Sequence, residues 1–203
     1  MGIAERIIGA IVLFTEVLRV NLDNVTWHLT RHSVDESEFR MFSLFKKKSL
    51  EVYAPVKGVV MAMADVQDPV FAQNMMGEGI AIQYEEGDVY APIEGKVASV
   101  IKPSYHAFGM QAASGLEVLV HVGLDTVTLG AGIFQPLVNQ GDEAHIGEKL
   151  LTIHNDGLQQ SGLMLTTPIV ILANDHIKHV EYCVAPGDKA VPGETLIMRC
   201  EVC

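Results

Sequence analysis

Cysteine, positive charge and long apolar segments are all scarce in this chain of 203 residues. The three cysteines, Cys183, Cys200 and Cys203, are an odd number, which argues against a disulfide framework and for reduced thiols in a cytoplasmic protein. Lys and Arg number 14 against 25 Asp and Glu, and the net charge of -11 argues against a nucleic-acid partner. The longest early apolar run, residues 7–14, is far shorter than the ~20 residues that a helix needs to cross a bilayer. Arg6 is the only positively charged residue before that run, and no small-x-small cleavage site follows it, so the sequence does not predict an export signal.

The first 50 residues differ in character from the rest. Residues 1–40 join a helix-like apolar stretch to a polar stretch without a clear period, and we expect them to be an extension outside the domain. The next ten residues, "MFSLFKKKSL" at 41–50, read as a fresh protein start, so Met41 is predicted to be the natural initiator. They could be a basic amphipathic segment in peripheral contact with an acidic membrane surface, or a solvated leader. Residues 51–203 are then the domain.

From residue 52 onward, short runs of Val, Ile and Ala alternate with turn residues every 8 to 12 positions or so. This spacing predicts an all-β sandwich or barrel with little helix. Two internal repeats support it, because turn residues recur at equivalent places, proline and glycine in the first repeat and glycine in the second. The repeats are "YAPVKGVV" (53–60) with "YAPIEGKV" (90–97), and "GDEAHIGEKLLTIH" (141–154) with "GDKAVPGETLIMRC" (187–200). A helical turn or two is expected at 155–165, and a loop with a turn at 68–76.

Two of the eight histidines are singled out by their surroundings. In "EVLVHVGL" a period of two places the valines on one strand face and Glu117, Leu119 and His121 on the other. The valine face suits a core, so the histidine face should be half-exposed. His106 lies near the start or end of a neighbouring strand, and the turn at 112–115 makes a hairpin that brings both imidazoles onto one sheet. The other six are expected to be surface or satisfied side chains: His28, His32, His145, His154, His176 and His179.

The residues alone leave three kinds of chemistry open for two adjacent imidazoles. Neutral histidine is a common zinc ligand, and it is also an acid or base at neutral pH. It can also take a group covalently while a neighbour steadies the charge. In the covalent scheme Gly123 leaves room beside His121 for a partner, and Asp125 could bind a cation on the donor.

Six segments in order resemble the glucose-type enzyme IIA domain of the bacterial phosphoenolpyruvate-dependent sugar phosphotransferase system. They are "YAPVKG", "DPVFAQNMMGEGIAI", "YAPIEGKV", "SYHAFG", "GLEVLVHVGLDTV" and "TTPIVILAN", within about residues 51–197. The specific part is "VHVGLDTV" with the hydroxyl-x-His-Ala motif before it. The resemblance implies an antiparallel β-sandwich with internal duplication, of the duplicated hybrid motif type. It also implies a phosphotransferase component with a phosphohistidine intermediate, without a required cofactor, that serves a separate permease.

The resemblance further implies roles for individual residues. His121 would accept a phosphoryl group through Nε2 from the small phospho-histidine carrier protein and pass it to a cysteine of a sugar-permease IIB domain. His106 would hydrogen-bond that group, and Ser104, where the family usually has threonine, would orient His106. Asp125 would face a basic residue of the partner. The partner-binding surface would include Val70, Phe71 and Leu119.

The sequence also departs from the family pattern. Tyr105 is larger than expected between Ser104 and His106, and "GAGIF" at 130–134 lacks the usual polar-Gly-acid-Gly pattern. Neither departure removes a group that the resemblance makes catalytic.

Other functions use some of the same residues. A zinc peptidase of the lysostaphin type has a related β-architecture but needs a His-x-His pair, and Gly123 stands two residues after His121. A regulatory binder, switched by phosphorylation of His121, would be an added role. A zinc ion at such an interface could take His106 and His121, with a third ligand from the partner. "CEVC" at 200–203 has metal-like spacing, but a single terminal pair is a weak signal.

Overall fold

The computed structural model describes residues 49–128, 132–154 and 165–202. The extension expected at 1–40 lies outside these residues, as does almost all of the helix expected at 155–165. Of the leader expected at 41–50, only the last two residues are described. They form the start of strand β1 (Ser49–Tyr53), so the sheet begins two residues before the expected domain boundary. No helix in the described part of the chain is long and apolar enough to cross a membrane.

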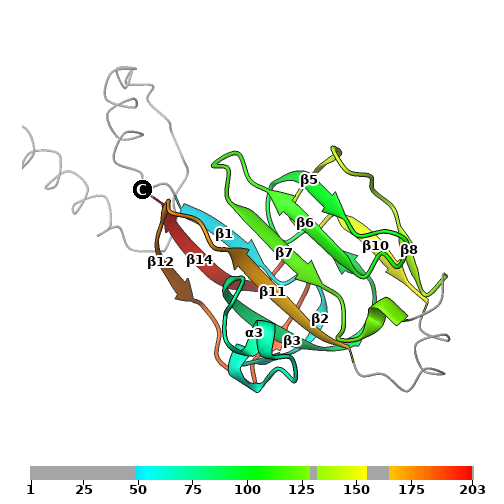
Figure 1. The fold of residues 1–203 in the computed structure, drawn as a ribbon, viewed down its shortest axis with the longest axis horizontal. Helices are drawn as coiled ribbons and strands as arrows, with labels where there is room; N and C mark the ends of the chain where they lie inside the picture. The colour runs from blue at the N-terminus through cyan, green and yellow to red at the C-terminus, as the bar shows by residue number, and fades with distance from the viewer. Residues whose placement is uncertain (1–48, 129–131, 155–164, 203) are drawn as a thin grey trace, which may run out of the picture. The chain divides into compact units, whose positions relative to one another are not determined.

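The described residues form antiparallel sheets with very little helix, which confirms the predicted fold class. The largest sheet has eight strands in the order β13-β2-β3-β11-β7-β6-β5-β9 (Figure 1). Their bounds in that order are Lys189–Ala190, Lys57–Met61, Gly77–Glu86, Thr166–Leu172, Glu117–His121, Ala107–Gln111, Gly95–Val100 and Glu143–Ala144. One small sheet, β1-β14-β12, adds Leu196–Val202 and Ile177–Tyr182 to β1, and the other, β4-β10-β8, consists of Val89–Tyr90, Lys149–Ile153 and Phe134–Pro136.

The large sheet consists of two halves of four strands, and equivalent strands follow in the same order from the centre of the sheet to its two edges. This arrangement confirms the internal duplication predicted from the repeats. The first repeat pairs with itself across the pseudo-twofold axis: Tyr53 N–H donates to the Pro92 carbonyl, and Tyr90 N–H donates to the Pro55 carbonyl, both at 2.8 Å. Each strand of one half has an equivalent in the other half: β2 corresponds to β5, β3 to β6, β11 to β7, and β13 to β9.

The second repeat places a glycine at the same point of each copy. Gly147 and Gly193 meet near this axis, and a Cβ added to Gly193 would lie 2.7 Å from the Gly147 Cα. Real Cβ atoms do not approach backbone so closely, so no larger residue fits without moving one of the two turns.

The core lies between the large sheet and the two small ones. Strand β7 shows which face of the large sheet covers the core. Its residues Val118 and Val120 are fully buried on that face, while the alternate residues Glu117, Leu119 and His121 are half-buried on the other. The main cluster joins residues from all three sheets, including Val52, Leu150, Leu151, Ile197 and Met198.

A second, smaller cluster lies on the opposite face of the large sheet. It contains Met63, Val66 and Phe71, from the chain between β2 and β3, packed on Ala81 and Val170. This connection includes the 3-10 turn η1 (Met63–Asp65) and the short helix α3 (Pro69–Ala72). The segment 68–76, expected to be a loop with a turn, therefore contains one turn of helix. Asp68 caps it by accepting a 2.8 Å hydrogen bond from the Val70 N–H, and Pro69 follows.

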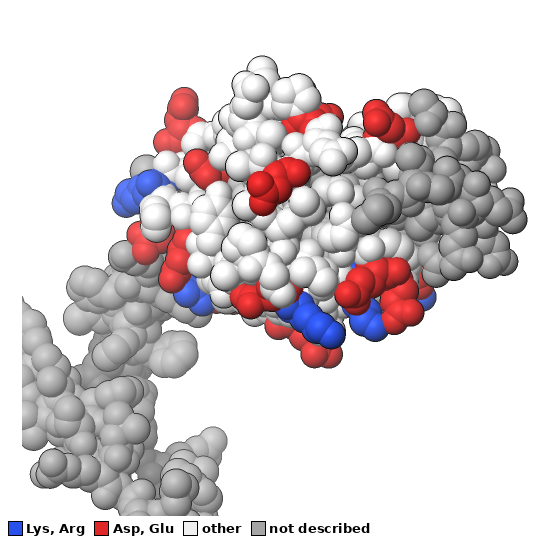
Figure 2. Space-filling view, turned by 90° about the horizontal axis from the view of Figure 1, so that it is seen from below, with Lys and Arg blue, Asp and Glu red and all other residues white. Residues whose placement is uncertain are grey.

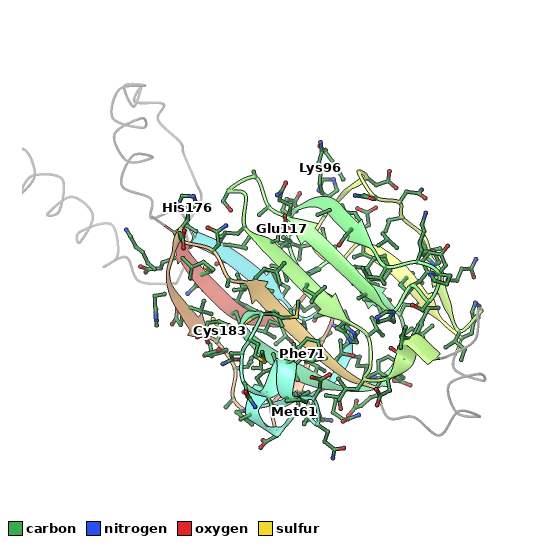
Figure 3. All side chains as sticks on the ribbon, viewed as in Figure 1. Met61, Phe71, Lys96, Glu117, His176 and Cys183 are labelled. Atoms are coloured by element: carbon green, nitrogen blue, oxygen red, sulfur yellow. The ribbon has the colours of Figure 1, made fainter. Side chains whose placement is uncertain are left out.

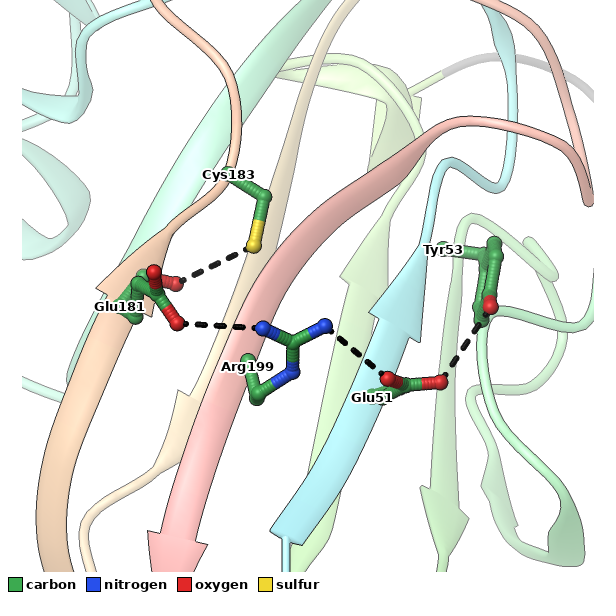
Figure 4. Close-up of polar contacts among 5 residues, drawn as sticks. All are labelled: Glu51, Tyr53, Glu181, Cys183 and Arg199. Carbon is green, nitrogen blue, oxygen red and sulfur yellow. Dashed lines mark hydrogen bonds and ion pairs between the residues drawn. The ribbon is translucent and has the colours of Figure 1, made fainter. Parts of the chain in front are cut away.

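Among the described residues, no Asp, Glu, Lys or Arg side chain is buried. On the outside of the sheet β1-β14-β12, Arg199 bridges Glu51 (3.1 Å) and Glu181 (3.3 Å), as Figure 4 shows. On the face in Figure 2, acidic side chains stand at many points between uncharged areas, as expected from the net charge of -11.

Candidate functional site

The two histidines singled out in the sequence lie against each other at one end of β6 and β7. Ala107 pairs with His121 in the ladder, and the Val122 N–H donates to the His106 carbonyl at 2.6 Å. The imidazole centroids are 4.8 Å apart and the rings are nearly perpendicular, with an interplanar angle of 74°. The hairpin therefore brings both rings together, as predicted from the turn between the strands.

His121 is held in one tautomer by its own turn. Its Nδ1 lies 2.8 Å from the Gly123 carbonyl oxygen, which can only accept, so Nδ1 carries the proton and Nε2 keeps its lone pair. Burial is the main cause that lowers the pKa of His121, with a smaller contribution from His106. The Gly123 hydrogen bond and the Asp68 carboxylate oppose this shift. His121 is therefore a neutral, oriented imidazole at neutral pH.

The turn that carries the Gly123 carbonyl is tightly fitted. Gly123 has a φ of +76°, and a Cβ there would lie 2.3 Å from Leu165 Cδ2 and 2.5 Å from Thr126 Cγ2. The buried Thr126 hydroxyl donates to the Val122 carbonyl at 2.8 Å and approaches the Gly123 carbonyl at 3.4 Å. Only glycine fits this turn without strain, and the Thr126 hydroxyl helps to fix the Val122 and Gly123 carbonyls.

His106 is oriented by the hydroxyl predicted to orient it. Ser104 Oγ lies 2.5 Å from His106 Nδ1, and the imidazole is buried, with 8% of the residue exposed. Burial lowers the pKa of His106, so this ring is also neutral at neutral pH. If the Ser104 hydroxyl donates to Nδ1, Nε2–H is left as a donor near His121.

Helix α3 and its N-cap bring Phe71 and Asp68 to His121 from a distant part of the chain. Figure 3 shows Phe71 on this segment, away from Glu117 at the start of β7. The Phe71 ring centroid is 5.2 Å from that of His121, and Phe71 is only 6% exposed, whereas Val70 is 39% exposed. The sequence analysis does not predict that Asp68 lies near His121. The Asp-Pro pair at 68–69 is a helix-start signal that could have drawn attention to Asp68.

The remaining predicted site residues are also in the described part. Asp125 is exposed, with a left-handed φ of +56°, four residues beyond His121. Leu119 is half-buried and packs against the second cluster, which contains Phe71. The four predicted surface histidines that are described are all exposed: His145, His154, His176 and His179.

Two of the cysteines, Cys183 and Cys200, lie in the described residues, where the first is exposed, the second is buried and both are free thiols. Burial and the Glu181 carboxylate raise the pKa of the Cys183 thiol, and burial raises the pKa of Cys200. Cys203, the last residue of "CEVC", is outside the described residues. In the residues that are described, no three or more His, Cys, Asp or Glu side chains are grouped to hold a metal ion. The predicted zinc ion, with its third ligand from a partner, stays a prediction.

Comparison with known proteins identifies the family. Residues 50–177 match the family described as phosphoenolpyruvate-dependent sugar phosphotransferase system, EIIA 1. The chain belongs to this family. It is therefore an EIIA-type component of a sugar phosphotransferase system, and the resemblance seen in the sequence is confirmed.

Relatives and a solved structure of the same type are similar over most of the chain. The PTS system glucose-specific EIIA component of Staphylococcus epidermidis is 42% identical over 151 residues, covering 74% of this chain and 89% of the relative. That of Staphylococcus aureus is 38% identical over 152 residues, covering 75% and 90%. The structure of glucose permease IIA from Mycoplasma capricolum has a TM-score of 0.67 and 34% identity, and covers 76% of this chain and 97% of that one.

In this EIIA chain only one of the duplicated halves carries the histidine pair. The hydrogen bond to the His106 carbonyl has a counterpart in the other half, where the Ala173 N–H donates to the Met76 carbonyl at 2.9 Å. Gly77 pairs with Leu172 just as Ala107 pairs with His121. Met76 and Leu172 thus occupy the places of His106 and His121, and both pack against the second cluster.

Proposed function

We propose that this chain is a phosphocarrier whose acceptor atom is Nε2 of His121. A phosphorylated histidine carrier protein docks, a bond forms between Nε2 and phosphorus, and the nitrogen–phosphorus bond of the carrier breaks. In the second step a cysteine thiolate of a sugar-permease IIB domain attacks phosphorus, and the bond to His121 breaks. No cofactor is needed, because both steps exchange one phosphoryl group between protein nucleophiles.

The observation that carries this proposal is the hydrogen bond from His121 Nδ1 to the Gly123 carbonyl (2.8 Å). It directs the lone pair of Nε2 away from the turn, and burial keeps the ring unprotonated by lowering its pKa. After transfer the phosphorylated ring becomes more positive, and the Gly123 carbonyl stabilises that charge through the same hydrogen bond. One contact thus serves the acceptor before and after the reaction.

His106 is proposed to steady the transferred group. Its ring stands almost perpendicular to that of His121 with the centroids 4.8 Å apart, so its Nε2–H can reach a phosphoryl oxygen on His121. Phosphoryl transfer depends on positioning and charge stabilisation rather than on covalent help, and a fixed neutral donor supplies both. Ser104 fixes that donor by its contact with Nδ1.

The surface around the pair suits partners that dock and leave. Val70 is 39% exposed and Val127 is 62% exposed, and the acidic side chains Asp68 and Asp125 lie on the same segments. An apolar patch beside carboxylates favours a partner with an apolar contact surface and basic residues. A small interface of this kind belongs to the weak, transient class.

The test is transfer of labelled phosphate from phosphoenolpyruvate through enzyme I and the histidine carrier protein, comparing wild type with His121→Gln and His106→Gln. We expect acid-labile label on wild type, none on His121→Gln, and label that His106→Gln holds but fails to pass to a IIB domain. A glucose-type permease is the first acceptor to use, because the relatives named above are glucose-specific components. Unlabelled wild type, with both upstream proteins shown to be active, would refute the proposal.

A further inference from the structure

Tyr105, between Ser104 and His106, has an unusual backbone conformation. Its φ of +58° is in the left-handed region, which in the described residues only two other non-glycine residues adopt, Asn74 and Asp125. Asn and Asp tolerate this region through their short polar side chains, whereas an aromatic residue there is strained. Strain of this kind persists only where the surroundings enforce it, and it concentrates at functional sites.

Backbone hydrogen bonds enforce the conformation. The Tyr105 N–H donates to the Ile101 carbonyl at 2.8 Å, and the Ile101 N–H donates to the Ala107 carbonyl at 3.0 Å. These bonds close the loop back on the start of β6. The left-handed residue then reverses the chain locally, and this reversal lets Ser104 Oγ reach His106 Nδ1 at 2.5 Å.

The side chain is a poor choice for such a turn unless its ring contributes something. The ring is half-buried and packs against the main core cluster. The phenol hydroxyl has no hydrogen-bond partner in the part of the chain that the structure describes, so the ring, not the hydroxyl, makes the contact. Glycine would relieve the backbone strain and keep the backbone hydrogen bonds, but it would remove the packing of the ring on the core.

We propose that Tyr105 is a positioning residue whose ring fastens loop 101–105 to the core and thereby holds Ser104 and His106 in place beside His121. It acts through the hydrogen bond between Ser104 and His106, and touches neither the phosphoryl group nor the docked partner. The kinetic part of this inference rests on the proposed phosphocarrier function, whereas the structural part does not.

The test compares Tyr105→Gly and Tyr105→Asn, which both suit a left-handed backbone, with the conservative Tyr105→Phe. Phosphoryl transfer is followed at varied concentrations of the phosphorylated carrier protein, and ring-nitrogen NMR reports on His106. For the Gly and Asn variants we expect a maximal rate lower by about tenfold, since small misplacements of catalytic groups cost up to about a hundredfold. The KM for the carrier should not change, and the Nδ1 resonance of His106 should move toward that of a Ser104→Ala protein.

Two controls and three outcomes decide the matter. Tyr105→Phe should keep the wild-type maximal rate and the wild-type His106 resonance. Asn74→Gly, a substitution at another left-handed position, should also leave both unchanged. A wild-type rate and a wild-type His106 resonance in Tyr105→Gly and Tyr105→Asn would overturn the proposal. A raised KM with an unchanged maximal rate would make Tyr105 a docking contact and would also overturn it. If wild type accepts no phosphoryl group, the phosphocarrier function fails, and the resonance alone still decides whether Tyr105 maintains the hydrogen bond to His106.

Discussion

Replacing Gly123 by alanine tests whether the turn after His121 is as tightly determined as its geometry indicates. A residue with a Cβ is strained at a φ of +76°, by about 1–2 kcal/mol. The added methyl group would also meet Leu165 Cδ2 at 2.3 Å and Thr126 Cγ2 at 2.5 Å. Both neighbours are buried, so they cannot move into solvent, and forced overpacking costs about 1–3 kcal/mol more. We therefore expect the free energy of unfolding to fall by about 2–5 kcal/mol.

A matched control separates the two contributions. Gly115 has a similar φ of +86°, but an added Cβ would meet nothing within 4 Å. Gly115→Ala should therefore show only the backbone cost, about 1–2 kcal/mol. Equilibrium urea unfolding of both variants measures the difference, provided that the slopes with denaturant stay equal. Equal losses in Gly123→Ala and Gly115→Ala would refute the steric argument, and with it the claim that Leu165 and Thr126 confine this turn.

Three further predictions concern the same site. Thr126→Val removes the buried hydroxyl but keeps the shape, so we expect a loss of about 1–3 kcal/mol in urea unfolding that Thr126→Ser largely avoids; a neutral Thr126→Val would contradict this. Burial lowers the pKa of His106 and His121 below the unfolded value of ~6.5, so the unfolded chain takes up protons first and stability falls as pH drops below that value, by at most about 1.4 kcal/mol per histidine and pH unit. His106→Gln and His121→Gln should each reduce the loss of stability measured between pH 7 and pH 5, and an unchanged loss would argue against the lowered pKa values. Phe71→Ala opens a cavity beside His121, so we expect a loss of about 3–5 kcal/mol in urea unfolding and a His121 pKa closer to its ordinary value by NMR titration; an unshifted pKa would mean that Phe71 does not shield the ring.

The sequence could predict the features of the site that depend on neighbouring residues. The period of two in "EVLVHVGL" correctly separates the buried Val118 and Val120 from the half-buried His121, because successive side chains of a strand point to opposite faces. The hairpin joining β6 and β7 is also local, so the approach of His106 to His121 follows from a short turn. The two repeats likewise predict the duplication, because glycine recurs at equivalent turns in both of them and proline in the first.

Contacts between distant segments could not be predicted in this way. Phe71 and Asp68 reach His121 because the chain between β2 and β3 crosses the outer face of the large sheet, and no local pattern specifies that path. Strands β3 and β4 show the same limit. They follow one another in the sequence, yet β3 pairs with β2 and β11 whereas β4 pairs with β10, because a turn does not determine which strands become partners.

The duplicated halves contribute unequally to the site, and each needs the other. In the half that includes β4 to β10, a short loop at 101–106 leaves the two histidines at the end of the sheet. In the other half the equivalent connection, between β2 and β3, is longer and carries Phe71 onto the His121 ring. That half has Met76 and Leu172 where the histidines would be, and these apolar side chains pack against the cluster that contains Phe71. One half therefore supplies His121, the proposed acceptor, and the other supplies apolar side chains that help to bury it and so lower its pKa. Either half alone would lack one of the two properties, a fixed ring and a lowered pKa, on which the proposed role of His121 depends.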